Sequence, residues 1–163
     1  MSELGLDISS ILLKELFLPD CTPFSSKEEL FEYMSGRFEE TGIVLDRKAF
    51  KQALEKRESL GPTYMGDFIA IPHGQCTEVL KPGVGFIRCS DSFNYDSAGD
   101  SGPVKYVFVL AVSSSQEGNQ HLKILATLAG YLMRDDFRDL MEHAGSYEEF
   151  MEGISRIESS EEE

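Results

Sequence analysis

The sequence lacks any apolar run that approaches the roughly 20 residues needed to span a bilayer. Its opening residues, MSELGLDISSILLKELFL, also lack the basic segment and small-residue cleavage site of a secretory signal. The cysteines Cys21, Cys76 and Cys89 are odd in number and show no CxxC spacing, which is typical of reduced thiols and not of disulfides. We therefore expect a cytoplasmic protein without direct membrane insertion.

Positive charge is scarce as well. The chain has 15 lysines and arginines against 29 aspartates and glutamates, which gives a formal net charge of -14. A protein that binds the phosphate backbone of a nucleic acid needs an excess of lysine and arginine, so no nucleic-acid partner is expected. The acidity fits repeated docking to a basic protein partner, because complementary fields speed encounter. It also fits a role in solubility alone, and the sequence leaves both interpretations open.

The 163 residues suit one domain with its own core, and we find no internal repeat. Short runs without polar residues predict strands buried on both faces, which requires helices on both sides of the sheet. We expect strands at 11–18 (a helical turn is the alternative), 68–71, 84–89 and 104–113, with a polar loop at 91–103. Helices are expected from Ser25 or Ser26 to Gly42, from Asp46 to about Arg57, and at 121–133, 135–145 and 146–157.

The fold class is therefore α/β, with one domain at residues 1–157 and an acidic, disordered tail at 158–163. The helix at 121–133 is expected to face the core with Leu122, Leu125, Ala126, Ala129 and Leu132.

One of the three histidines lies in the stretch GDFIAIPHGQ, at residues 66–75. Pro72 lacks a backbone donor and restricts the residue before it, so the strand is expected to stop there. Gly74 would let the chain turn without shielding the imidazole of His73. Ligands of open α/β sheets bind beyond the carboxyl ends of strands, which makes His73 a candidate site residue. The alternative is a histidine that only caps a strand.

A second histidine, His121, follows the longest predicted strand and a polar loop, and it opens a predicted helix. The unpaired amides and the dipole at a helix N-terminus favour an anion such as phosphate. Two histidines expected at the same end of the sheet therefore indicate phosphoryl chemistry. The alternative for His121 is an ordinary polar residue in a first helical turn.

The segment RESLGPTYMGDFIAIPHG, from Arg57 to Gly74, is followed 48 positions after His73 by HLKILATLAGYLMRDDF. These two segments closely resemble the enzyme IIA domains of the fructose/mannitol class, which belong to the bacterial phosphoenolpyruvate-dependent sugar phosphotransferase system. The likeness extends from about Ile11 to Ile157. It implies a fold in which a mixed sheet is sandwiched between helices.

The resemblance also implies an activity. Members of the family accept a phosphoryl group from the phosphocarrier protein HPr on a histidine. They pass it to a cysteine of enzyme IIB, which phosphorylates the sugar that enters through the membrane component, enzyme IIC. The phosphorylated histidine corresponds to His73, the second active-site histidine to His121 and a supporting arginine to Arg57, while Thr63 matches a commonly polar position. No cofactor or metal is expected, because the phosphohistidine donor is already activated.

The physical roles follow from phosphoryl transfer, which asks mainly for positioning and charge stabilisation. A neutral imidazole nitrogen of His73 is the nucleophile. His121 and the helix amides can donate to phosphoryl oxygens, and Arg57 can balance their charge. The other nitrogen of His73 should be held by a backbone carbonyl or a side chain, and the sequence does not indicate which.

Other interpretations remain. His73 and Cys76 form a His-x-x-Cys pair, but a metal site needs three or four ligands. His143, near a helix C-terminus, is expected to be structural. The chain could also be a regulatory, nitrogen-type enzyme IIA, or a catalytically silent interaction module. The segment PTYMG looks closer to fructose- and mannitol-type members, and Tyr64 and Met65 in it either form a docking surface or pack inward.

Overall fold

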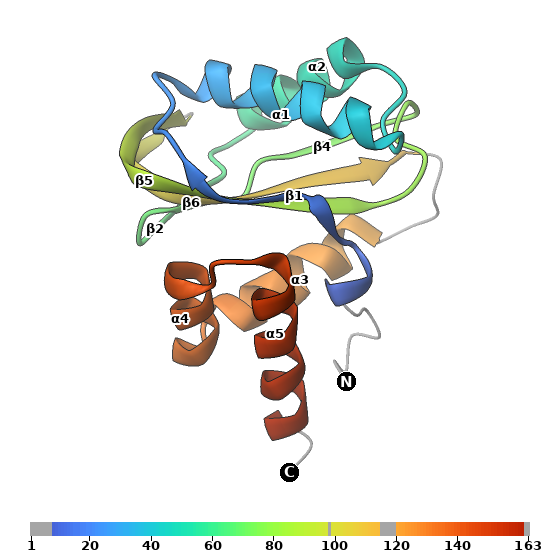
Figure 1. The fold of residues 1–163 in the computed structure, drawn as a ribbon. Coiled ribbons are helices and arrows are strands. Elements are labelled where there is room, and N and C mark those ends of the chain that lie inside the picture. Colours follow the sequence, from blue (N-terminus) through green and yellow to red (C-terminus); the bar gives the residue numbers. More distant parts are fainter. Residues whose placement is uncertain (1–7, 98, 115–119, 162–163) are drawn as a thin grey trace.

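A mixed β-sheet forms the middle layer of the molecule, with helices on both faces (Figure 1). The computed structural model describes residues 8–97, 99–114 and 120–161. Within them, the six-stranded sheet has the order β1-β5-β6-β3-β2, and β4 also pairs with β6. Its strands are β1 (Leu12–Cys21), β2 (Tyr64–Gly66), β3 (Ile69–Ala70), β4 (His73–Cys76), β5 (Gly83–Ser97) and β6 (Asp100–Ser113). The predicted class, a mixed sheet sandwiched between helices, is confirmed.

Both parallel and antiparallel pairs occur in this sheet. β1 runs parallel to β5, and both β3 and β4 run parallel to β6. The pairs β5–β6 and β2–β3 are antiparallel. β6 is thus the central strand, and it holds β4 beside its carboxyl end through the register His73↔Leu110 to Cys76↔Ser113.

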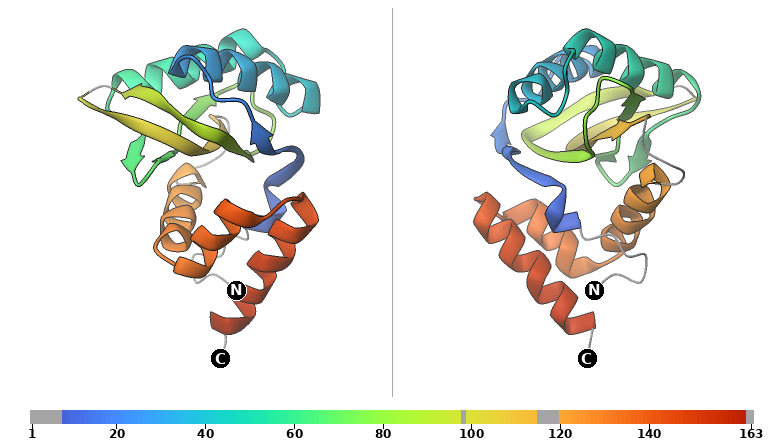
Figure 2. Two further views of the ribbon diagram at one scale, coloured as in Figure 1. Left: turned by 60° about the vertical axis from the view of Figure 1, so that its left-hand side comes forward. Right: turned by 90° about the vertical axis from the view of Figure 1, so that its right-hand side faces the viewer.

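Helices α1 (Lys27–Thr41) and α2 (Arg47–Ser59) cover one face of the sheet (Figure 2). Their ends follow the predicted signals, because the Ser26 side chain accepts from the Glu29 amide and the Asp46 carboxylate accepts from the Lys48 and Ala49 amides. α1 ends at Gly42, whose φ of 84° suits glycine. The core beneath these helices contains Phe31, Met34, Phe38, Phe50 and Leu54.

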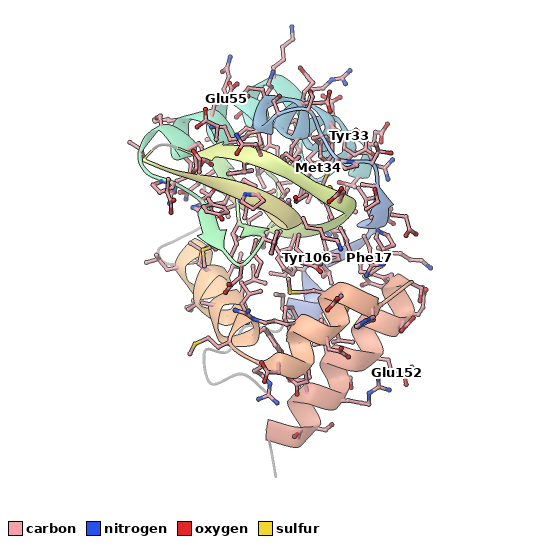
Figure 3. The ribbon with its side chains drawn as sticks, turned by 90° about the vertical axis from the view of Figure 1, so that its left-hand side faces the viewer. Phe17, Tyr33, Met34, Glu55, Tyr106 and Glu152 are labelled. Atoms are coloured by element: carbon pink, nitrogen blue, oxygen red, sulfur yellow. The ribbon has the colours of Figure 1, made fainter. Side chains whose placement is uncertain are left out.

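The other face carries the short 3-10 helix η1 (Ile8–Ser10) with α3 (Gln120–Leu132), α4 (Asp135–His143) and α5 (Tyr147–Glu161). Aromatic rings fill the core on this face: Phe86 stacks on Phe17 at 5.5 Å and on Phe150 at 5.3 Å between ring centroids. Figure 3 labels Phe17 and Tyr106 on this side of the sheet and Met34 on the side of α1. Two separate cores therefore hold the helical layers to the sheet.

Three sequence-based expectations are wrong in part. The segment expected to be a polar loop belongs to the β5–β6 hairpin, which is paired as far as Ser97↔Asp100. It is polar because only alternate residues, namely Phe93, Tyr95 and Ser97, are buried. The strand signal was hidden because its solvent-facing residues are serine, asparagine and aspartate.

The second difference concerns α3, which is rotated from the expected orientation. Ile124, Leu128 and Tyr131 are buried beside Leu132, whereas Leu122, Ala126 and Ala129 are exposed. The helix is apolar on several sides, so periodicity alone does not select the buried one.

The third difference concerns the tail expected at 158–163. α5 continues to Glu161, and residues 162–163 lie outside the described part. Contacts with the core explain the extension, since Ile157 is buried and the Tyr131 hydroxyl donates to Glu158 Oε2 at 2.8 Å.

Candidate active site around His73

His73 is the first residue of strand β4. The sequence had suggested instead that His73 lies where a strand ends. β3 stops at Ala70, Pro72 follows, and β4 then resumes the pairing with β6 beside its carboxyl end. The general location, beside the carboxyl-terminal part of β6, from which the chain leads to α3, agrees with the expectation. The break between β3 and β4 is the feature that Pro72 produces.

Gly74 is needed here for a different reason from the one predicted. A Cβ at this position would lie 3.0 Å from Phe50 Cε1 and 3.2 Å from the Leu54 amide nitrogen of α2. Gly74 therefore allows α2 to lie close against β4.

Both ring nitrogens of His73 have partners. Nδ1 lies 3.1 Å from the carbonyl oxygen of Ile71, and Nε2 accepts from the Arg57 Nε–H at 3.0 Å. A carbonyl oxygen can only accept, so Nδ1 carries the proton and Nε2 keeps its lone pair. The sequence left the partner of the second nitrogen open, and the structure identifies it as the Ile71 carbonyl. Such a neutral imidazole has its nucleophilic nitrogen directed toward Arg57.

Arg57 reaches His73 from the last turn of α2. Its Nη1 donates to the Gly61 carbonyl at 2.8 Å, so the guanidinium bridges the loop after α2 and the imidazole. A pocket of about 250 Å³ opens beside this pair, lined by Ala53, Lys56, Arg57, Leu60, His73 and Gln75. Two of these groups are cations, which suits a phosphoryl group in the pocket.

His121, the second predicted site residue, is the second residue of α3. Its side chain and residues 115–119 lie outside the described part of the structure. Its predicted role therefore stays a prediction. Its backbone position at the first turn of a helix agrees with the expectation.

Thr63 is buried, and its hydroxyl is engaged with other groups than the imidazole. The Thr63 hydroxyl donates to Glu58 Oε1 at 2.6 Å and lies 2.7 Å from the Tyr95 hydroxyl. Its link to the site runs through the backbone, because the Thr63 carbonyl accepts from the Ile71 amide at 3.0 Å. Glu58, only 3% exposed, was not singled out in the sequence, although the adjacent pair Arg57-Glu58 is part of the recognised segment.

Cys76 and His143 were the other candidates considered. Burial raises the pKa of the half-buried Cys76 thiol, which disfavours its thiolate form. His143 is exposed on α4 and pairs with Asp139 at 3.0 Å. In the described part of the chain, no three histidine, cysteine or acidic side chains are grouped as metal ligands would be.

Comparison with known proteins decides the family. Residues 10–157 match the family model described as phosphoenolpyruvate-dependent sugar phosphotransferase system, EIIA 2. The chain belongs to this EIIA 2 family. It is therefore a phosphotransfer component, as the resemblance of the motif around His73 implied.

Relatives of this EIIA 2 chain carry different descriptions. It is 32% identical over 151 residues to a fructose-specific EIIA component of Haloferax volcanii. The aligned region covers 93% of this chain and 96% of that relative. It is 33% identical over 130 residues to a fructose-specific EIIABC component of Bacillus subtilis, covering 80% of this chain but 20% of the longer relative. The crystal structure of the nitrogen regulatory protein IIA-Ntr from Neisseria meningitidis superposes with a TM-score of 0.79 at 30% identity, covering 90% and 98% of the two chains.

These similarities include both sugar-specific and nitrogen regulatory proteins, so they establish a phosphoryl carrier without choosing between the two roles. The chain spans only about a fifth of the length of the EIIABC relative. None of the helices in the described ranges has the length and apolar character that a membrane span requires.

Proposed function

We propose that this EIIA accepts a phosphoryl group from phosphorylated HPr on Nε2 of His73 and passes it to a cysteine of enzyme IIB during sugar uptake. The observation that carries the proposal is the pair of contacts at the His73 ring, in which Nδ1 lies against the Ile71 carbonyl and Nε2 accepts from Arg57. Together they require the Nδ1–H tautomer, with the Nε2 lone pair facing the Arg57 side of the pocket. In the transfer, Nε2 forms the new N–P bond as the donor's N–P bond breaks. The donor imidazole keeps the electron pair of the broken bond.

The proton on Nδ1 stays in place during this step. The ring gains positive charge as the N–P bond forms, and the Ile71 carbonyl stabilises that charge through its hydrogen bond. The hydrogen bond from Arg57 Nε–H to the lone pair of His73 Nε2 has to break before phosphorus can approach that nitrogen. The guanidinium is then placed to donate to phosphoryl oxygens, where charge-assisted hydrogen bonds are strongest.

His121 supports the transfer in this proposal without being phosphorylated itself. The supporting observation is its position in the first turn of α3, after the end of β6. Helix amides and a donor side chain there would stabilise the equatorial oxygens of the transferring group.

HPr and enzyme IIB have to dock in turn on the surface around His73, because it is the single proposed relay point. Met65, 53% exposed, and Leu60 at the pocket are apolar groups available for such contacts. Tyr64 packs inward, with its ring against Gly102, so only Met65 of the two predicted candidates is offered to a partner. The Bacillus subtilis relative, named as an EIIABC component, supports an enzyme IIB partner.

A nitrogen-type regulatory role is the second candidate function. The superposition with IIA-Ntr of Neisseria meningitidis favours it, and in that case the phosphorylation state of His73 would control partner proteins. The Arg57–His73 contact argues against a third candidate, a silent interaction module, because it provides an intact acceptor. Transfer from the phosphorylated protein to purified enzyme IIB distinguishes the first candidate from the second.

The test uses phosphoenolpyruvate, enzyme I and HPr with the intact chain. We expect an acid-labile, base-stable adduct that maps to His73 and is absent in His73→Ala. The adduct should disappear when enzyme IIB is added, while the cysteine of enzyme IIB becomes labelled. Label on His121 or His143 would contradict the proposal.

A further inference from the structure

A buried carboxylate lies behind the proposed site and is surrounded by hydrogen-bond donors. Glu58 belongs to the last turn of α2, and its side chain points into the interior below the loop 60–63. Its Oε1 accepts from the Thr63 hydroxyl at 2.6 Å and from the Tyr95 hydroxyl at 3.1 Å. Its Oε2 accepts from the Thr63 amide at 3.1 Å and from the Ser97 hydroxyl. We call Glu58, Thr63, Tyr95 and Ser97 the Glu58 cluster.

The Glu58 cluster joins segments far apart in the chain. Tyr95 and Ser97 belong to the outer half of β5, 37 and 39 residues from Glu58, and all four side chains are buried. A carboxylate is buried only where donors compensate its desolvation, and here four donors do so. Such a fully satisfied polar cluster fixes one arrangement of its members, because any displacement leaves a buried group without its partner.

Two hydrogen-bonded routes lead from the Glu58 cluster to the imidazole of His73. In the first, the Thr63 carbonyl accepts from the Ile71 amide at 3.0 Å, and the carbonyl of the same Ile71 accepts from His73 Nδ1 at 3.1 Å. In the second, the loop held by Thr63 presents the Gly61 carbonyl to Arg57 Nη1 at 2.8 Å. Arg57 Nε in turn donates to His73 Nε2 at 3.0 Å. Both ring nitrogens are thus connected to the same buried carboxylate.

We propose that Glu58, acting through Thr63, Tyr95 and Ser97, is a positioning residue that fixes the Nδ1–H tautomer of His73 and the approach of Arg57 to it. This inference deepens the proposed function and rests on it. Glu58 contacts neither the imidazole nor the phosphoryl group in this scheme. It fixes the position of the loop 60–63. In that position the Ile71 carbonyl contacts His73 Nδ1, and the Arg57 guanidinium contacts His73 Nε2.

The test compares Glu58→Gln and Tyr95→Phe with the wild-type chain. Glu58→Gln keeps the shape of the side chain but places an amide donor where an oxygen accepts from Thr63 and Ser97. Tyr95→Phe removes a single hydroxyl from the Glu58 cluster and keeps the ring. The matched control is Tyr131→Phe, which also removes one hydroxyl from a buried tyrosine. That hydroxyl is partly buried and donates to a glutamate, Glu158, on the other face of the sheet.

The first measurement does not depend on activity. Nitrogen-15 NMR of the His73 ring in the unphosphorylated protein reports which nitrogen is protonated. We expect Nδ1–H in the wild type and in Tyr131→Phe, and a mixture of tautomers in Glu58→Gln. If Glu58→Gln does not fold, Tyr95→Phe decides the question with the same spectrum. A wild-type tautomer in folded variants of the Glu58 cluster would overturn the proposal.

The second measurement is the rate of transfer from phosphorylated HPr over a range of HPr concentrations. We expect the maximal rate to fall about tenfold in Glu58→Gln, with an unchanged half-saturating concentration, because misplacement of reacting groups slows chemistry without altering docking. An equal loss in Tyr131→Phe would overturn the proposal. If the wild type takes no phosphate on His73, the proposed function fails, whereas the NMR measurement still decides the positioning role.

Discussion

Gly74→Ala tests the close approach of α2 to β4 that brings Arg57 to His73. The added Cβ would lie 3.0 Å from Phe50 Cε1, 3.2 Å from Ala53 Cβ and 3.2 Å from the Leu54 amide nitrogen. All three atoms belong to α2, and one of them is backbone and another is part of a buried ring, so the strand and the helix have to separate by a few tenths of an ångström. Overpacking of this kind costs about 1–3 kcal/mol of unfolding free energy.

The same displacement would also lengthen the Arg57–His73 contact, which is 3.0 Å in the present structure. We therefore expect a roughly tenfold slower transfer from HPr, since small displacements of reacting groups have effects of this order or larger. Urea denaturation measures the stability, and quenched-flow phosphorylation measures the rate.

Gly130→Ala is the matched control for this experiment. Gly130 is an exposed residue of α3, and a Cβ there would meet nothing within 4 Å. Alanine in a helix should be neutral or stabilising by about 0.5–1 kcal/mol, with an unchanged transfer rate. A Gly74→Ala protein as stable and as fast as the wild type would refute the argument that close packing of α2 on β4 positions the site.

Three further predictions concern reactivity and docking. Burial raises the pKa of Cys89 to about 12, so its thiol should react with a disulfide reagent at pH 8 only after unfolding in urea; rapid labelling of the folded protein at Cys89 would contradict this. His121→Ala should slow onward transfer to enzyme IIB by a factor of about 10², and unchanged rates in both directions would make His121 a bystander. Added salt and Met65→Asp should each slow transfer from HPr. The control is Leu45→Asp, an exposed position before the start of α2 and so at the opposite end of this helix from Arg57, which should leave the rate unchanged. A rate insensitive to both salt and Met65→Asp would place docking on another surface.

The sequence predicted those parts of the fold that depend on local signals. The cap signals at Ser25 or Ser26, at Gly42 and at Asp46 predicted both ends of α1 and the start of α2 closely, because each cap is formed by residues within one turn. The pairing of β5 with β6 beyond Phe93 was missed, because it depends on burial under distant helices and its residues are mostly polar.

The candidate site shows the same division. The motif around His73 indicated the family, which the family model confirms. The structure brings Arg57, which was expected to balance phosphoryl charge, into contact with the imidazole of His73. The Ile71 carbonyl and the Glu58 cluster could not be predicted, since they depend on how the loop after α2 meets β3 and the outer half of β5. Gly74 was assigned a turn, while its actual constraint is the proximity of Phe50, more than 20 residues away in the chain.

The most direct test of the account identifies the phosphorylated nitrogen. Phosphorus-31 and nitrogen-15 NMR of the chain labelled with nitrogen-15 histidine, after phosphorylation by HPr, resolves the N–P bond and the remaining N–H. The account predicts phosphorus on Nε2 of His73 with the proton retained on Nδ1, where the Ile71 carbonyl holds it. Phosphorus on Nδ1 of His73, or on another histidine, would contradict it.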